Sequence, residues 1–219
     1  MCVERRRGEA NDHYTNLMKW LAVVLVYLAI GVGFFWAHSA WVTLLGFHAA
    51  MIVCLIIAKP RLSFSISFQN TNPTWTITSI LLCASSGVCL YFLRNYFGFA
   101  ADLHTQLESI GLTTQAWLPF MLYAVPVNPF LEECFWRGYL GSEAKGLYPF
   151  DLFFAGYHIL ILIGKVNWLA IVLIVIALSF AAWFWRQVAR QSGGLPAPML
   201  GHMAADLTIL LAIYRITMS

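Results

Sequence analysis

The stretch Leu17–Trp36, LMKWLAVVLVYLAIGVGFFW, decides the fold class of this chain. It carries a single charge, Lys19, and an apolar run of roughly 20 residues is what a helix needs to cross a hydrocarbon core about 30 Å thick. Three consecutive arginines precede it at 5–7, as in a signal peptide or a twin-arginine leader. The run is too long for a signal peptide and lacks a small-x-small cleavage site, so we interpret it as a retained first membrane helix.

Further apolar windows follow along the rest of the chain, and they leave little sequence for a soluble domain. The most polar internal stretch, Ala101 to Gln115, predicts an interfacial helix or a loop. We therefore expect an all-α fold, a polytopic transmembrane helical bundle of about seven spans. Six further windows follow the first one: Trp41 to Ala58, Trp75 to Phe97, Ala116 to Tyr139, Pro149 to Gly164, Val166 to Trp185 and Pro196 to Tyr214.

Composition agrees with a chain that lies in a bilayer. Hydrophobic residues make up 60% and charged residues 11%, which is far from the balance of an ordinary soluble domain. The net charge of +3 includes no basic stripe, so nucleic acid is not an expected partner. The cysteines form no CxxC pair and are expected as small buried hydrophobes: Cys2, Cys54, Cys83, Cys89 and Cys134.

The distribution of Lys and Arg predicts the orientation, because cytoplasmic loops hold these residues in excess. With the N-terminus cytoplasmic, ten basic residues fall on the inner side and three on the outer side. We expect an integral protein of the cell membrane, plasma or inner, with its C-terminus outside. The inner set is Arg5, Arg6, Arg7, Lys19, Lys59, Arg61, Arg137, Lys145, Arg186 and Arg190, and the outer set is Arg94, Lys165 and Arg215.

Ionisable residues inside apolar windows are expensive to place in a membrane and are functional candidates for that reason. The fourth window contains LEECFWRGYL at 131–140. Glu133 and Arg137 are four residues apart on one helix face and are expected to pair, whereas Glu132 points about 100° away and is free of that pair. A purely structural ion pair at a helix end accounts for Glu133 and Arg137 but leaves Glu132 unexplained.

Two other windows carry polar residues to a similar depth. His158 follows Phe154 by four residues in the fifth window, and His202 precedes Asp206 by four residues in the seventh. Counted from the predicted inner helix ends, Glu132 lies roughly 15 Å deep, His158 roughly 14 Å and His202 roughly 9 Å. Three helices therefore carry acid and base groups to a similar depth in the cytoplasmic half of the membrane.

These motifs resemble the CPBP family, which includes CAAX prenyl endopeptidases and bacteriocin-processing or immunity proteins. The family pattern is EExxxR, FxxxH and HxxxN or HxxxD on separate membrane helices. It matches Glu132, Glu133 and Arg137, then Phe154 and His158, then His202 and Asp206. The resemblance covers about Trp117 to Tyr214, so we expect N-terminal membrane helices of unassigned role over 1–100 and a catalytic membrane core over 116–214. Asp206 stands where many members have Asn.

The resemblance implies an intramembrane endopeptidase that cuts a membrane-anchored protein or peptide. Glu132 and His158 then activate water, since a carboxylate in a low-dielectric cavity is a competent base. His202 would stabilise the oxyanion, with Asp206 orienting it or donating while protonated. Glu133 and Arg137 would support Glu132. Substrates in the family include prenylated C-termini, peptide precursors and C-terminal sorting tails.

Alternative interpretations of the same residues stay open at this level. Glu, His and Asp also form proton relays in transporters, and an immunity or scaffold protein could keep the motifs without activity. The mechanism requires no cofactor, although Glu, His, His and Asp match zinc ligand types without an HExxH motif. Cys134 is a poor nucleophile candidate because no separate Cys-His signature accompanies it. His48 is expected as a packing or interhelical bonding residue.

Overall fold

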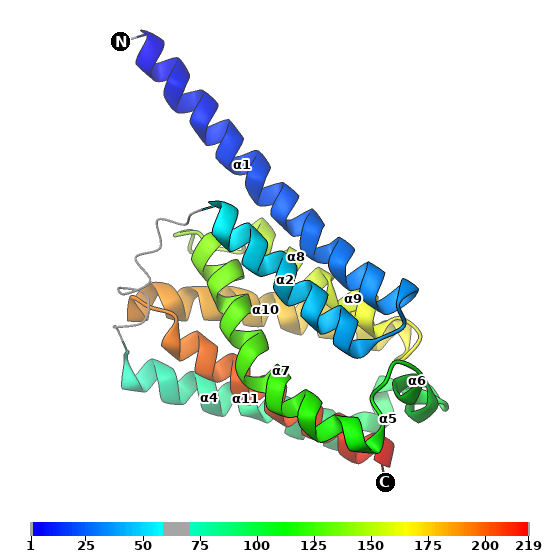
Figure 1. The fold of residues 1–219 in the computed structure, drawn as a ribbon. Helices are drawn as coiled ribbons and strands as arrows, with labels where there is room; N and C mark the ends of the chain where they lie inside the picture. Colours follow the sequence, from blue (N-terminus) through cyan, green and yellow to red (C-terminus); the bar gives the residue numbers. More distant parts are fainter. Residues whose placement is uncertain (1, 59–70, 219) are drawn as a thin grey trace.

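The computed structural model describes residues 2–58 and 71–218, with side chains from residue 16 onward, and all regular secondary structure in these ranges is helical. The all-α prediction is confirmed. Lys59 and Arg61, and the side chains of Arg5, Arg6 and Arg7, lie outside what is described. The helices are α1 (Cys2–Gly31), η1 (Val32–Trp36), α2 (Ala40–Ala58), α4 (Pro73–Phe92), α5 (Arg94–Phe97), α6 (Leu103–Ser109), α7 (Thr114–Glu132), η2 (Glu133–Tyr139), α8 (Pro149–Gly156), α9 (His158–Leu162), α10 (Trp168–Ser192) and α11 (Pro196–Met218) (Figure 1).

Five of the described helices are long and apolar enough to cross a membrane, and a sixth span results if one bent pair is counted together. That pair joins Leu103–Ser109 to Thr114–Tyr139 with a bend of 72°. The fifth predicted window appears as a shorter apolar helix, Pro149–Leu162. The chain is thus a polytopic helical membrane protein. The five single spans are Asn16–Trp36, Ala40–Ala58, Pro73–Phe92, Trp168–Ser192 and Pro196–Met218.

Local sequence explains where several helices begin and end. The side chains of Asn72 and Asn167 accept hydrogen bonds from backbone N–H groups in the first turns of α4 and α10, at 3.3 and 2.7 Å, as N-cap residues do. Gly193 ends α10 with a φ of 71°, a left-handed conformation that glycine adopts without strain. The predicted polar stretch before α7 contains the short helix α6.

The tightest helix pair is α4 against α11, and small residues make the approach possible. A Cβ added to Gly87 would lie 2.1 Å from the backbone of Thr208, and one added to Gly201 would lie 2.0 Å from the hydroxyl of Ser79. Small residues at such crossings let membrane helices pack closely without a hydrophobic driving force from water. Helix α11, which carries the third motif, is therefore fixed against α4.

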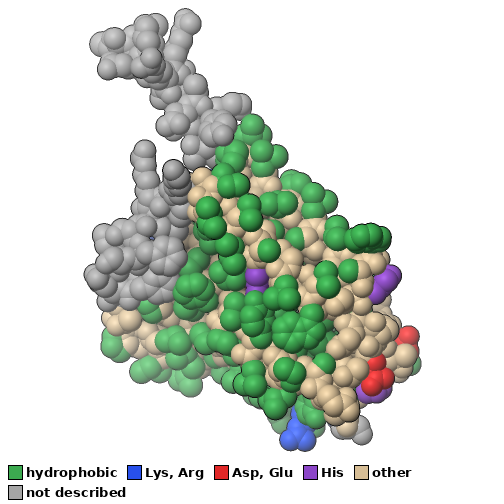
Figure 2. All heavy atoms as spheres, viewed as in Figure 1, with side chains coloured by type: hydrophobic (Ala, Val, Ile, Leu, Met, Phe, Trp, Pro, Cys, Tyr) green, Lys and Arg blue, Asp and Glu red, His purple; other side chains and the backbone are tan. Residues whose placement is uncertain are grey.

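The outer surface is apolar over long stretches, as expected beside lipid. Figure 2 shows hydrophobic side chains over much of the described part of the face in view, whereas the charged side chains coloured there lie towards the end where α11 finishes. Large side chains such as Leu81, Phe92 and Leu122 are each more than 60% exposed. One cluster of buried aromatic and aliphatic residues contains Phe135, Trp136 and Phe154, and the ring of Phe154 contacts the motif residues Arg137 and His202.

Candidate active site

The first motif lies where helix α7 changes its hydrogen-bonding pattern. From Glu133 onward the backbone is π-helical, and the N–H of Leu140 donates to the carbonyl of Phe135, five residues earlier, at 2.9 Å. The sequence predicted one uninterrupted helix to Tyr139. Prolines at 119, 126 and 129 lie inside α7, and each removes a backbone donor from the regular ladder. Single π-helical turns are frequent at functional sites.

The predicted pairing of Glu133 with Arg137 is confirmed. Nη1 of Arg137 lies 3.2 Å from Oε1 of Glu133, and both side chains are at most 2% exposed. The guanidinium carbon sits 4.3 Å from the ring centroid of Phe154 and 5.0 Å from that of Trp185. Neither Nη1 nor Nη2 has a hydrogen-bond partner within the described ranges. The cation is therefore held by one carboxylate and two aromatic faces.

Glu132 is fully buried and is held from one side. The hydroxyl of Tyr157 donates a hydrogen bond of 2.5 Å to its Oε1. Its other oxygen, Oε2, lies 3.4 Å from Nε2 of His202 and has no hydrogen bond to any described residue. One carboxylate oxygen is fixed, and the other faces an imidazole.

His202 connects three carboxyl groups. Its Nδ1 lies 2.9 Å from Oε1 of Glu133, and its Nε2 lies 3.4 Å from Oε2 of Glu132 and 3.6 Å from Oδ1 of Asp206. The ring stacks on Trp185 with centroids 4.4 Å apart. Of the four side chains in these contacts, that of Asp206 is the most exposed, at 23%.

His158 joins the cluster through aromatic rings. Its Nδ1 lies 3.1 Å from the backbone carbonyl of Phe154. A carbonyl can only accept, so Nδ1 carries the proton and Nε2 keeps a lone pair. The ring stacks on Tyr157 at 4.1 Å, and the Phe154 ring lies edge-on to both His158 and His202 at 5.5 and 5.8 Å. Tyr157, which donates a hydrogen bond to Glu132, thus also packs on His158.

The structure links five of the motif residues by ion-pair contacts and places His158 beside them through the rings of Tyr157 and Phe154; the five are Glu132, Glu133, Arg137, His202 and Asp206. Three further residues that sequence analysis missed contact this cluster. Tyr157 immediately precedes His158 and binds Glu132. Asn128 donates to Oδ2 of Asp206 at 3.1 Å, and its position one helical turn before Glu132 was the available signal. Trp185 carried no such signal, since aromatic residues at span ends are common.

The two discounted residues lie as expected. His48 makes interhelical contacts from α2, with Nδ1 at 3.1 Å from the hydroxyl of Tyr123 and Nε2 at 3.2 Å from Oδ1 of Asn128. Cys134 is buried in the core at 1% exposure. In the part of the chain that the structure describes, no group of three or more His, Cys, Asp or Glu side chains has an arrangement suited to a metal ion.

Fold and site together define a class: a helical integral membrane protein with a buried cluster of carboxylates and imidazoles. Residues 114–208 match the family of Rce1-like, type II CAAX prenyl endopeptidases. The match contains all three motifs and confirms, over this part of the chain, the predicted resemblance to CPBP family intramembrane peptidases. The family that residues 114–208 match consists of CAAX-type proteases, which are hydrolases. Searches of curated proteins and of solved structures found no match.

Proposed function

We propose that this protein is an intramembrane endopeptidase that hydrolyses a peptide bond in a membrane-associated protein or peptide, with water activated by Glu132 and His158. The observation that carries the proposal is that only one carboxylate oxygen of Glu132 is hydrogen-bonded by the described residues. Tyr157 fixes Oε1 at 2.5 Å, while Oε2 is fully buried and has no hydrogen bond from the described residues. A buried oxygen without a hydrogen-bond partner costs free energy, and a catalytic role is one reason for a protein to keep such a group.

The proposed reaction needs no covalent intermediate with the protein. Oε2 of Glu132 removes a proton from water, and the water oxygen bonds to the scissile carbonyl carbon. The proton then passes to the leaving amide nitrogen as the C–N bond breaks, which yields a carboxylic acid and an amine. The lone pair on Nε2 of His158 can share that proton.

The tetrahedral intermediate carries negative charge on the former carbonyl oxygen and needs a donor there. We assign this role to His202, with Asp206 orienting it or donating while protonated. Glu133 and Arg137 are supporting residues, since Glu133 holds Nδ1 of His202 at 2.9 Å and Arg137 balances Glu133. No step requires a cofactor, and a chelator tests whether a divalent metal such as zinc takes part.

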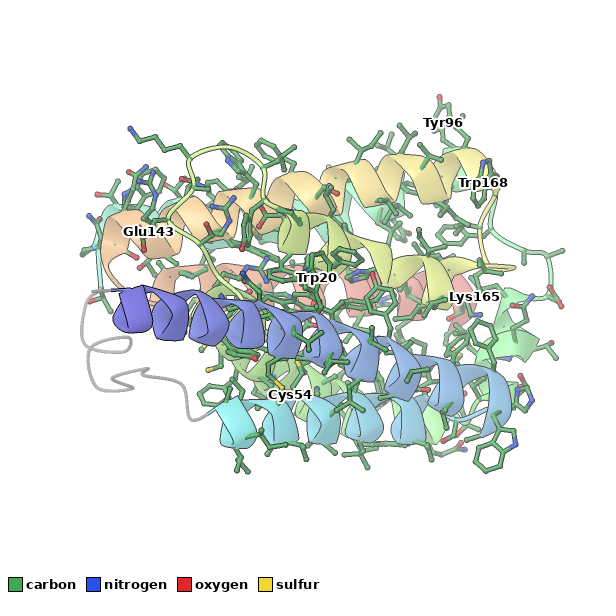
Figure 3. The ribbon with its side chains drawn as sticks, turned by 90° about the horizontal axis from the view of Figure 1, so that it is seen from above. Trp20, Cys54, Tyr96, Glu143, Lys165 and Trp168 are labelled. Carbon is green, nitrogen blue, oxygen red and sulfur yellow. The ribbon has the colours of Figure 1, made fainter. Side chains whose placement is uncertain are left out.

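The proposed topology has seven crossings, with the N-terminus cytoplasmic and the C-terminus outside. Figure 3 supports it: Glu143, before α8, lies at one end of the bundle, and Lys165, after α9, lies at the other, so the short α8–α9 pair connects both ends. Arg137 and Arg186 are buried in ion pairs. Without them, eight basic residues against three still favour this orientation.

Reporter fusions test that topology. A reporter after Ser219 should be active outside and one within residues 59–72 should be active inside; a cytoplasmic C-terminus contradicts seven crossings. We further propose that 116–214 is the catalytic core, that the helices of 1–100 support it, and that the protein resides in the plasma or inner membrane.

The direct test of function uses the purified full-length protein in detergent. It is incubated with membrane-anchored peptides that carry a prenylated C-terminus, a peptide precursor or a sorting tail, with and without chelator, and fragments are identified by mass spectrometry. We expect cleavage of at least one class, and none by His158→Gln. If no peptide is cut and the protein in liposomes instead dissipates a pH gradient, the transporter interpretation replaces ours.

A further inference from the structure

A chain of hydrogen bonds reaches the site through Asp206. It starts on α2 at His48, passes through Asn128 on α7 and ends on α11 at Asp206. His48 is 2% exposed, so this polar chain runs through the protein interior. Buried polar chains of this kind are costly unless every member is paired, and here each link has a partner.

The direction of each hydrogen bond follows from chemistry. The carboxamide oxygen of Asn128 can only accept, so Nε2 of His48 carries the proton in the 3.2 Å contact. Nδ1 of His48 then accepts from the hydroxyl of Tyr123 at 3.1 Å. With its oxygen occupied by His48, Asn128 must present its NH₂ group to Oδ2 of Asp206.

We propose that Asn128, oriented by His48, is a positioning residue that fixes Asp206 beside His202; the proposal rests on the proposed peptidase function. Asp206 is partly exposed and lies 3.6 Å from Nε2 of His202, a longer contact than an ordinary hydrogen bond. The bond from Asn128 is what keeps this carboxyl group from turning away. Nε2 of His202 also faces Oε2 of Glu132 at 3.4 Å. The position of Asp206 therefore determines which of the two carboxyl groups interacts with the His202 imidazole.

The test is a swap of the two polar side chains in the full-length protein. Asn128→Asp places two carboxyl groups opposite each other and should lower kcat about tenfold to a hundredfold, the effect of losing a partner that orients a reacting group. KM should stay within about threefold, because Asn128 contacts no substrate in this account. Asp206→Asn alone should have a smaller effect, because one of two facing amides can turn.

The double variant Asn128→Asp/Asp206→Asn restores a donor–acceptor pair with the roles exchanged. It should recover at least about tenfold of the kcat that Asn128→Asp loses, a coupling that independent sites do not show. A double variant no faster than Asn128→Asp overturns the proposal. If Asn128→Asp does not accumulate, Asn128→Ala replaces it, and an unchanged kcat then overturns the proposal.

Two histidine variants make a matched comparison. His48→Leu removes the group that orients the amide and should lower kcat by less than Asn128→Asp, whereas His104→Gln on α6, 45% exposed and paired with Glu108, should leave it unchanged. Equal kcat values for both histidine variants contradict the role of His48. A wild-type protein without cleavage removes the peptidase function itself, whereas an active wild type with a failed swap removes only this inference.

Discussion

Two buried arginine–carboxylate pairs in this molecule differ in how completely they are satisfied. Arg186 on α10 makes a two-point contact with Asp151, from Nε at 3.0 Å and from Nη2 at 2.7 Å. The same guanidinium donates to the backbone carbonyls of Ser142, Ala144 and Gly146. Arg186 therefore fastens the loop between η2 and α8 to α10.

Arg137 is equally buried but poorly satisfied. It has one ion pair with Glu133, two aromatic faces, and terminal nitrogens without hydrogen bonds to described residues. Burial of an ion pair therefore does not by itself mark a functional site. The satisfied pair is structural, whereas the unsatisfied pair borders the carboxylate and imidazoles of the candidate active site.

The largest expected loss of stability follows Arg186→Ala. The change leaves Asp151 buried without its cation and takes the Arg186 donors from three carbonyls, of which that of Ala144 keeps a donor from Gln187. Breaking such a pair costs about 3–5 kcal/mol. Thermal unfolding in detergent should show a lower midpoint and a lower folded yield. The folded fraction should keep its cleavage rate per molecule, and a variant that melts like the wild type contradicts the structural role.

Arg137→Ala should lower the stability less than Arg186→Ala does and should lower the cleavage activity more. Glu133 keeps its contact with His202, so we expect a loss of about 1–3 kcal/mol, the range for an unsatisfied buried group. The cleavage rate should fall by more than the folded fraction does. A variant that accumulates and melts like the wild type yet is inactive would show that Arg137 acts in the chemistry rather than in structure.

The smallest expected effects separate two nearby tryptophans on α10. Trp185 stacks on His202, and Trp185→Phe should cost about 0.5–1.5 kcal/mol and lower the cleavage rate. Trp183 donates from its indole to the carbonyl of Lys145, in the loop that Arg186 fastens, and Trp183→Phe should cost about 0.5–1.5 kcal/mol without a change in rate. Equal rate losses for both would remove the distinction between the two regions.

The same contrast explains what the sequence could and could not predict. Hydropathy located the helices because span length is set by bilayer thickness, and the i, i+4 spacing predicted the pair of Glu133 and Arg137. The motifs located the acid and base groups. Their partner Tyr157 was missed because contacts between helices far apart in sequence leave no periodic signal. Asp151 was missed for the same reason, as its partner Arg186 lies 35 residues away. Asn128 was missed although it lies one helical turn before Glu132.

The structure also changes two details of the sequence-based account. Arg186 was counted as a basic residue on the inner side, but its side chain is 4% exposed and neutralises Asp151. The helix through the first motif was expected as regular α-helix, but it becomes π-helical at Glu133. Both departures depend on tertiary packing and on backbone hydrogen bonds that a residue pattern does not encode.

The measurement that tests the central claim most directly is the single-turnover cleavage rate of Glu132→Gln, with Asp151→Asn as the matched control. The substituted carboxamide keeps an oxygen for Tyr157 but has no basic carboxylate, so the rate should fall by about 10²-fold or more, the contribution of a general base, with the unfolding midpoint nearly unchanged. Asp151→Asn should instead lower the midpoint and spare the rate of the folded protein. A Glu132→Gln protein that is folded and cleaves within about tenfold of the wild-type rate contradicts the role of Glu132 as the base.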